Sequence, residues 1–296
     1  MIKKRWNFHL AAILFVLPAL LLYTLLLINP VIQSVRMSLF SWNGIAQSPL
    51  VYVGLDNYRE LAQSGEFRRA LANVGKFLAV GFLLQMPMSF LLGLFITNKI
   101  KAVRFFKTAF FIPVILPITA ISIMWTFILW PTGGVVNSLM QALGMQGLIQ
   151  DWLGDPKIVS VTVPLVNMWI AVGLNMIIFS SGLVGIPDEL YEAAEMDGAI
   201  GFKKIWNITI PLLKDTFKVY SVLCVTGCLK VFDIVYVMTS GGPNGASDVP
   251  ATLLYYSAFK YQKYGFANSI GTVILILGLA GSVLINKFVN NDEITG

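Results

Sequence analysis

The stretch that decides the fold is IVSVTVPLVNMWIAVGLNMIIFSSGLVGIPDELYEAAEMDGAIGFKKIWNITIPLL, residues 158–213. Residues 158–181 contain no charged side chain and, as a helix, are long enough to cross a hydrocarbon core of about 30 Å. The following segment, residues 182–215, holds the densest acidic cluster of the chain: Asp188, Glu189, Glu192, Glu195 and Asp197. This stretch therefore predicts a membrane span followed by a segment at the membrane surface.

The composition of the whole chain favours lipid as its solvent. Hydrophobic residues make up 56% of the sequence and charged residues only 12%, against about 25% charged in soluble domains. The net charge of +6 could indicate nucleic acid, but that function needs cations clustered on a solvated face. Here the cations flank apolar runs, as they do at membrane edges. We expect an all-α integral membrane protein with no nucleic-acid partner.

Six apolar windows predict about six transmembrane helices in a single domain over residues 1–296: 8–28, 74–96, 106–129, 158–181, 216–238 and 266–288. The first window follows Lys3, Lys4 and Arg5, like a signal peptide. Its apolar run exceeds the roughly 7 to 15 residues of a signal peptide, so we interpret it as a helix.

The distribution of Lys and Arg predicts the orientation. Segments on the side of the N-terminus, including Lys99, Lys101 and the basic residues of 182–215, hold more cations than those on the other side. Cytoplasmic loops carry this excess. We therefore expect a multi-pass protein of the cell membrane with both termini, and residues 182–215, in the cytoplasm.

The acidic segment reads as two short helices joined by a turn. Pro187 suits a first helical turn, and Gly198 can take the positive φ that ends a helix. A second helix is expected from about Phe202 and should stop at Pro211. An acidic loop can be only a solvated connection. This one is longer than joining two spans requires, and its small-residue face suits insertion into a groove of a partner.

Six positions of this segment reproduce the spacing of the EAA motif: Glu192, Ala193, Ala194, Gly198, Ile208 and Pro211. The chain thereby resembles the permease subunits of ATP-binding-cassette (ABC) importers that work with a solute-binding protein. Ile210 stands where the motif usually has Leu, which is a conservative change.

Further blocks resemble the carbohydrate-uptake branch of these permeases, in particular the first permease subunit of maltose-type systems. They are LPALLLYTLLLINPVIQSVRMSLFSW (17–42), VGLDNYREL (53–61), FFIPVILP (110–117), GGVVNSLM (133–140), WLGDP (152–156) and FDIVYVMTSGGP (232–243). The resemblance covers nearly the whole chain and implies a type I ABC importer permease fold in which residues 182–215 form a coupling-helix loop. It also implies transport of a carbohydrate, without indicating which one.

The resemblance implies several partners. They are a second homologous permease subunit, two ABC ATPase subunits and an extracytoplasmic solute-binding protein that docks on loops 29–73, 130–157 and 239–265. The residues expected to couple to the ATPase are Glu192, Ala193, Ala194, Asp197, Gly198 and Gly201. The chain lacks a G-x-x-x-x-G-K-[ST] phosphate loop. We therefore expect no cofactor on this chain, with ATP and Mg used by the partner ATPase.

Candidates for the substrate pathway are polar or aromatic residues inside the apolar windows: Gln85, Asn167, Trp169, Asn175, Lys230, Asp233 and Tyr236. A sugar needs hydrogen-bond partners and flat apolar surfaces. Lys230 and Asp233 are spaced to share one helix face and pair with each other, either structurally or functionally. Hydrogen bonding between helices is the alternative role for the amide side chains.

Two other function classes are weaker. An ion-driven secondary transporter would show related halves and unpaired intramembrane carboxylates, but only Asp233 lies well inside a window. A membrane-embedded enzyme would need a cluster of His, Cys or carboxylate groups. The chain has one histidine, His9, so no metal site is expected.

Overall fold

A computed structural model of the 296-residue chain describes residues 2–97 and 102–290, with the side chains of 13–97 and 102–288. Five basic residues that contribute to the predicted orientation lie outside the described side chains: Lys3, Lys4, Arg5, Lys99 and Lys101. The chain divides into two compact units, described here one at a time. Unit 1 comprises Met1–Ser64 and Leu254–Val273, and unit 2 comprises Gly65–Leu253 and Ile274–Gly296.

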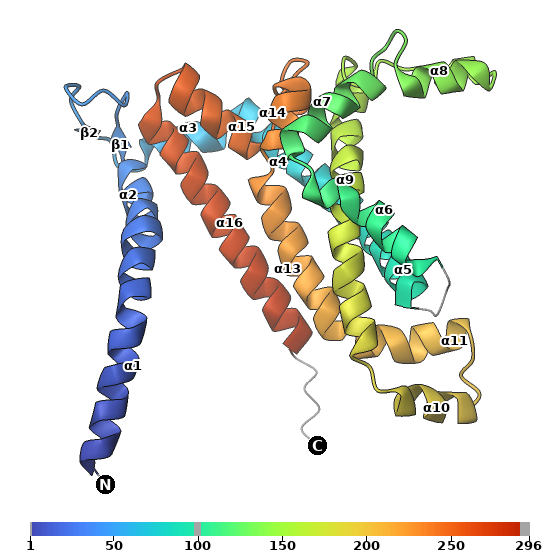
Figure 1. Cartoon of the computed structure of the whole chain (residues 1–296). Helices are drawn as coiled ribbons and strands as arrows, with labels where there is room; N and C mark the ends of the chain where they lie inside the picture. Colours follow the sequence, from blue (N-terminus) through green and yellow to red (C-terminus); the bar gives the residue numbers. More distant parts are fainter. Residues whose placement is uncertain (1, 98–101, 291–296) are drawn as a thin grey trace. The chain divides into compact units, whose positions relative to one another are not determined.

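Unit 1 begins with a long apolar helix (Figure 1). It consists of α1 (Ile2–Tyr23), a π-helical turn (Thr24–Ile28) and α2 (Asn29–Met37). The window 8–28 was expected to end where an outer loop begins, and this boundary is wrong because the helix continues to Met37. Pro30 follows the π-helical turn inside this continuous helix, which therefore lacks one N–H donor at that position. Of the apolar window within Ile13–Met37, 0% is buried.

The rest of unit 1 is a small assembly around a short hairpin. Strand β1 (Phe40–Ser41) pairs antiparallel with β2 (Val51–Tyr52). Helix α3 (Asp56–Gln63) supports it because the Asn57 amide donates to the backbone oxygens of Ser38, at 2.7 Å, and Phe40, at 3.0 Å. The elements that return to this unit are the end of α15 (Pro250–Tyr255), a π-helical segment (Tyr256–Lys260) and the start of α16 (Tyr264–Asn290).

Helix α9 (Pro156–Val184) is the central element of unit 2. Asp155 caps its N-terminus by accepting from the Lys157 N–H at 2.7 Å. Val159, Val163 and Phe179 are fully buried along its length. The predicted window 158–181 therefore lies within one continuous helix. The helix contains 29 residues, which corresponds to roughly 43 Å at 1.5 Å per residue.

A second long helix runs from Gly65 to Thr97 and packs against α9. It comprises α4 (Gly65–Val80), a π-helical turn (Gly81–Gln85) and α5 (Met86–Thr97), and contains the predicted window 74–96. Close approach to α9 depends on Gly93, where an added Cβ would lie 3.0 Å from the Phe179 Cβ. In the π-helical turn, the Gly81 carbonyl accepts from the Tyr220 hydroxyl at 2.7 Å.

The window 106–129 is not one straight span, contrary to the sequence prediction. It forms α6 (Val103–Ile115) and α7 (Ile118–Ile128), which meet at 101°. Leu116 is extended, as expected of a residue before proline, and so it ends α6. Alone, the 13 residues of α6 span roughly 20 Å, which is less than the hydrocarbon core.

The window 216–238 is also broken. Helices α13 (Lys214–Lys230) and α14 (Asp233–Thr239) are inclined by 44°. In the described part of the chain, four helices are long and apolar enough to cross a membrane, and the two bent pairs raise the number to six if each crosses as one span. Helix α16 contains the last predicted window, 266–288.

Short helices occupy the two ends of unit 2 (Figure 1). They are α8 (Val135–Ala142) and a 3-10 turn (Gln146–Leu148) at one end, and α10 (Asp188–Met196), α11 (Phe202–Lys204), a π-helical segment (Ile205–Thr209) and α12 (Ile210–Leu212) at the other. Helix α9 connects these ends, so the predicted surface segment 182–215 lies about one membrane thickness from α8.

Candidate functional site

The acidic segment forms an elbow, defined here as residues 185–213. Its first arm is α10, which begins after Pro187 as the sequence predicted. Asp188 and Glu189 lie in the first turn, where their charge is favourable next to the partial positive charge of the helix N-terminus. The negative charge of this arm is therefore compatible with a stable short helix.

Gly198 ends the first arm, which confirms the prediction for this residue. The Ala199 N–H donates to the Ala194 carbonyl at 2.8 Å and the Gly198 N–H to the Glu195 carbonyl at 3.0 Å. These two bonds form a Schellman motif, which requires a left-handed residue after the helix. Gly198 has φ +78° and Gly201 has φ +59°, so two glycines set the path between the arms.

The second arm runs from Phe202 to Leu212 as α11, a π-helical segment and α12. The sequence predicted that Pro211 would stop this helix, and that prediction is wrong. Pro211 lies inside the continuous helix, two residues after the π-helical segment ends, and it has no N–H to donate there. The arm ends one residue later, and after Leu213 the chain continues as α13.

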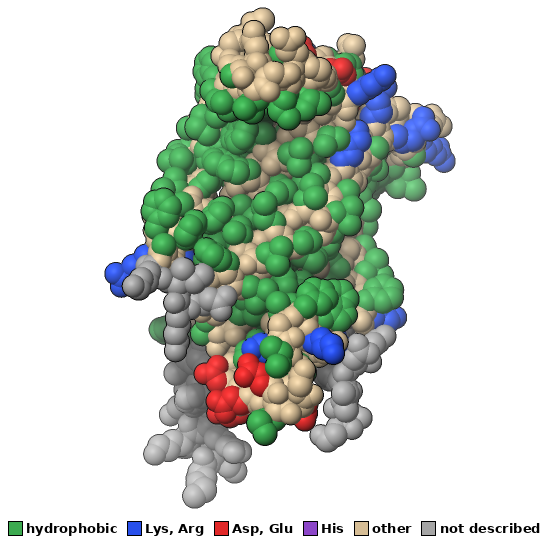
Figure 2. Space-filling view, turned by 90° about the vertical axis from the view of Figure 1, so that its right-hand side faces the viewer, with side chains coloured by type: hydrophobic (Ala, Val, Ile, Leu, Met, Phe, Trp, Pro, Cys, Tyr) green, Lys and Arg blue, Asp and Glu red, His purple; other side chains and the backbone are tan. Residues whose placement is uncertain are grey.

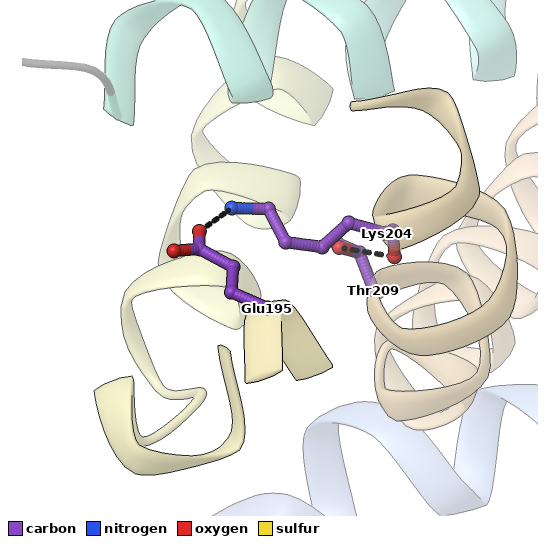
Figure 3. A network of polar contacts seen from close by, with 3 residues as sticks. All are labelled: Glu195, Lys204 and Thr209. Atoms are coloured by element: carbon purple, nitrogen blue, oxygen red, sulfur yellow. Dashed lines mark hydrogen bonds and ion pairs between the residues drawn. The ribbon is translucent and has the colours of Figure 1, made fainter. Parts of the chain in front are cut away.

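The two arms are tied together by Lys204 (Figure 3). Its Nζ lies 2.9 Å from Glu195 Oε1 and 5.3 Å from the centre of the Tyr191 ring. The Thr209 hydroxyl donates to the Lys204 carbonyl at 3.4 Å. The contacts with Glu195 and Tyr191 hold the second arm against α10, whereas the Thr209 bond lies within the second arm. The ion pair is partly exposed, so its contribution to stability is modest.

Most of the predicted coupling residues lie on the surface of the elbow. Glu192, Ala193, Asp197, Gly198 and Gly201 are exposed, and acidic side chains gather at the lower end of the space-filling view (Figure 2). Ala194 differs because it is buried at 5% exposure. It packs inside the chain, so it is not part of the exposed face.

Two apolar residues beside the acidic cluster were not singled out from the sequence. Met196 is 89% exposed and Ile200 is 71% exposed. Apolar side chains next to carboxylates form a surface that can bury area and pair with cations on a partner. The hydropathy of the sequence does not identify these two residues, because hydropathy alone does not indicate which apolar side chains stay exposed after folding.

A cavity of about 590 Å³ lies at the other end of unit 2. Its lining includes Trp130 and Asp151 from one loop region and Gly242 and Pro243 from another. It therefore brings together two segments predicted to be outer loops, 130–157 and 239–265. The sequence could not identify this cavity because its lining residues are distant along the chain.

Asp248 helps to hold the second of these segments. Its backbone oxygen accepts from the Asn73 amide at 2.9 Å, and its side chain accepts from the Thr252 hydroxyl at 2.9 Å. Burial raises the pKa of the Asp248 carboxyl and Glu66 adds to this, whereas Thr252 and Arg69 act to lower it. Burial is the largest of these effects, so the charged form is disfavoured.

The prediction that Lys230 and Asp233 share one helix face is wrong. Helix α13 ends at Lys230, and α14 begins at Asp233. Between them Val231 has ψ 126°, which is extended and turns the chain. Both side chains are exposed, and within the described residues they form no ion pair with each other.

The other substrate-pathway candidates lie in separate environments. Gln85 and Asn175 are buried, and the Asn175 amide donates to a carbonyl of its own helix, that of Ala171, at 3.1 Å. Trp169 packs edge-on against Trp125. Asn167 is half-buried and Tyr236 is stacked on Phe232. None of the seven candidates lines the cavity described above, so their role stays a prediction.

Residues 85–291 match the family described as "Binding-protein-dependent transport system inner membrane component". The probable ABC transporter permease protein YurN of Bacillus subtilis is 37% identical over 277 residues, which are 93% of this chain and 94% of YurN. The alpha-glucoside transport system permease protein AglF of Rhizobium meliloti is 36% identical over 275 residues, 89% of this chain and 78% of AglF.

A solved structure has the same fold. It is the crystal structure of a bacterial alginate ABC transporter in complex with an alginate pentasaccharide-bound periplasmic protein, and one of its chains matches with a TM-score of 0.82 and 24% identity. The match covers 100% of this chain and 98% of that chain, which confirms the predicted permease fold. The family match covers more than half of the chain, including α9, the elbow and α13. This chain therefore belongs to the inner membrane components of binding-protein-dependent transport systems.

Proposed function

We propose that this chain is the permease subunit of an ATP-driven importer that carries a carbohydrate across the bacterial cytoplasmic membrane. The observation that carries the proposal is the elbow, an exposed acidic arm inside the region that matches the family. The alpha-glucoside permease and the alginate transporter support a carbohydrate as the cargo. In this proposal both termini and the elbow lie in the cytoplasm.

The energy for transport comes from another subunit in this proposal. The sequence has no phosphate-binding loop, and no group of three His, Cys, Asp or Glu side chains that could hold a metal occurs among the described residues. Two ATPase subunits, which use ATP and Mg, bind the elbow of this chain and that of a second homologous permease subunit. Glu192 and Asp197 pair with basic or amide groups of the ATPase, while Ala193 allows close contact.

The elbow is mechanically coupled to the membrane helices through an apolar cluster. Ile186 at its start and Leu213 at its end pack in one apolar cluster with Phe179 of α9 and Tyr220 of α13. Because packed side chains resist deformation, a displacement of the elbow moves both helices together. Closure of the ATPase pair then tilts the helix bundles and exchanges outward for inward access.

The cavity at the opposite end is the proposed docking place of the solute-binding protein. It is open to the surface, and it offers the Trp130 ring, 51% exposed, and the exposed Asp151 carboxylate. A partner side chain that enters it can bury apolar area and form a charged hydrogen bond. The periplasmic protein bound in the alginate transporter structure supports a partner of this kind.

Vesicles containing the purified importer test the function. Uptake of labelled sugar should require ATP on the side of the membrane where the ATPase subunits are bound. It should also require the solute-binding protein and the second permease subunit. Uptake by this chain alone, driven by an ion gradient, would instead support a secondary transporter. The sugar bound by the solute-binding protein that co-purifies with the complex identifies the cargo.

A further inference from the structure

Two aromatic side chains are exposed on the second arm of the elbow. Phe202 is 75% exposed and Trp206 is 63% exposed. Their rings are stacked, with centroids 6.1 Å apart and an interplanar angle of 18°, and so they form one continuous apolar surface. Exposure of a patch of this kind to water is unfavourable, which indicates that it is covered in the working protein.

The charges of the elbow are segregated between its arms. The first arm carries Glu189 and Glu192. The second arm carries Lys203, which in the sequence stands between the two aromatic residues. Lys203 is exposed and, in the part of the chain that the structure describes, forms no ion pair. An anionic surface therefore attracts the second arm and repels the first.

The second arm is continuous with a membrane helix. Only Leu213 separates α12 from α13, and α13 carries the exposed apolar side chains Val219, at 50%, and Leu223, at 48%. These residues belong to one of the bent pairs with the composition of a span. The arm is therefore placed at the edge of the hydrocarbon region, where tryptophan and lysine are favoured. In Figure 1, α11 lies between α10 and the membrane helices of unit 2.

We propose that the second arm binds the headgroup of an anionic phospholipid, with Phe202 and Trp206 in the interface and Lys203 at the phosphate. The first arm, which points away from the lipid, then remains free for the ATPase. The proposal rests on the cytoplasmic orientation given under the proposed function, because that leaflet is the one with negative surface potential. Its test requires neither sugar nor ATP, so it can fail independently of transport.

Fluorescence quenching of the full chain in lipid vesicles tests the proposal. Vesicles of phosphatidylcholine and phosphatidylglycerol are prepared with bromine on the acyl chains of one lipid or the other. The contribution of Trp206 is the difference between the wild-type chain and Trp206→Phe. We expect brominated phosphatidylglycerol to quench this contribution about fivefold more effectively, which corresponds to about 1 kcal/mol for one lysine at an anionic surface.

Two further variants separate charge from position. Lys203→Glu should abolish the preference for phosphatidylglycerol, whereas Lys203→Arg should retain it. A matched control places the fluorophore on the first arm, as Met196→Trp in the Trp206→Phe chain. The fluorescence that this variant adds to that of the Trp206→Phe chain should be quenched by neither lipid. Met196 is 89% exposed, so the new ring meets no packed neighbour.

Three outcomes would overturn the proposal. They are absence of quenching at Trp206, equal quenching by both lipids with no effect of Lys203→Glu, and loss of quenching when the ATPase is added. The last result would show that the aromatic face is an ATPase contact.

Discussion

Gly198 illustrates how a single residue sets the shape of the elbow. An added Cβ would meet no atom within 4 Å, so the glycine is not required for space. It is required for conformation, because φ is +78° and L-residues in this region cost about 1–2 kcal/mol. The spacing in the sequence suggested this residue, and the backbone supplies the physical reason.

Replacing Gly198 with valine should therefore uncouple the elbow. We expect Gly198→Val to insert into the membrane but to lose most ATP-dependent uptake, because the Schellman motif cannot form without strain. Gly198→Asn should retain much more activity, since asparagine tolerates a left-handed conformation. Uptake and ATPase activity of the reconstituted complex measure the effect. Normal coupled uptake with valine would contradict the assigned role.

Asp248 predicts a pH-dependent contribution to stability. Its pKa is raised in the folded state, above the unfolded value of about 3.9. The stabilising contribution is therefore fully present below the unfolded pKa and is lost as pH rises through the folded pKa. Asp248→Asn keeps an oxygen for the Thr252 hydroxyl and removes the charge. The melting temperature of this variant should exceed that of wild type at neutral pH, and the difference should disappear towards pH of about 4. A difference independent of pH would show that burial of the charge is not its cause.

At the scale of elements, α6 and α9 depend on a close backbone contact. A Cβ on Gly173 would overlap the Phe110 carbonyl oxygen. We expect Gly173→Ala to destabilise the chain by about 1–3 kcal/mol, as overpacking does. Gly75→Ala in α4 is the control, because an added Cβ there meets nothing within 4 Å. Thermal unfolding of the purified chain measures both, and equal stability of the two variants would contradict a tight contact.

The ion pair between the arms should have a small but measurable effect. Glu195 and Lys204 are 55% and 30% exposed, so a double-mutant cycle with Glu195→Gln and Lys204→Gln should give a coupling energy of about 0.2–1 kcal/mol. Hydrogen exchange of the elbow amides measures this energy. A zero coupling energy would leave the glycines and the apolar cluster as the determinants of elbow geometry.

For the whole molecule, the proposed topology predicts two opposite labelling patterns. Met196, the last residue of α10, is 89% exposed, and Leu143, which directly follows α8, is 71% exposed. Helices α10 and α8 lie at opposite ends of unit 2 (Figure 1). In intact cells a membrane-impermeant thiol reagent should label Leu143→Cys from outside and should label Met196→Cys only after the membrane is opened. The wild-type chain gives the background from Cys224 and Cys228. Labelling of Met196→Cys from outside would place the elbow on the wrong side of the membrane.

The straight helices were predictable because apolar windows with at most one charged residue have the length that lipid requires. One bend also left a signal, since a residue before proline avoids the helical region and Leu116 precedes Pro117. The bend at Val231 left no such signal because neither glycine nor proline occurs there. Consequently the pairing of Lys230 with Asp233 was predicted from a helix that the structure does not contain.

The sequence by itself determined that the chain is a membrane protein, which family it belongs to and where α10 begins and ends. Composition, motif spacing and helix caps suffice for these conclusions because they can be read without knowing how distant segments pack. The tertiary structure alone decided which of two adjacent alanines is exposed, that Pro211 continues a helix and that distant loops form a cavity. The physical reason is that exposure and bending depend on the packing of segments far apart in the chain. A pattern of neighbouring residues does not contain that information.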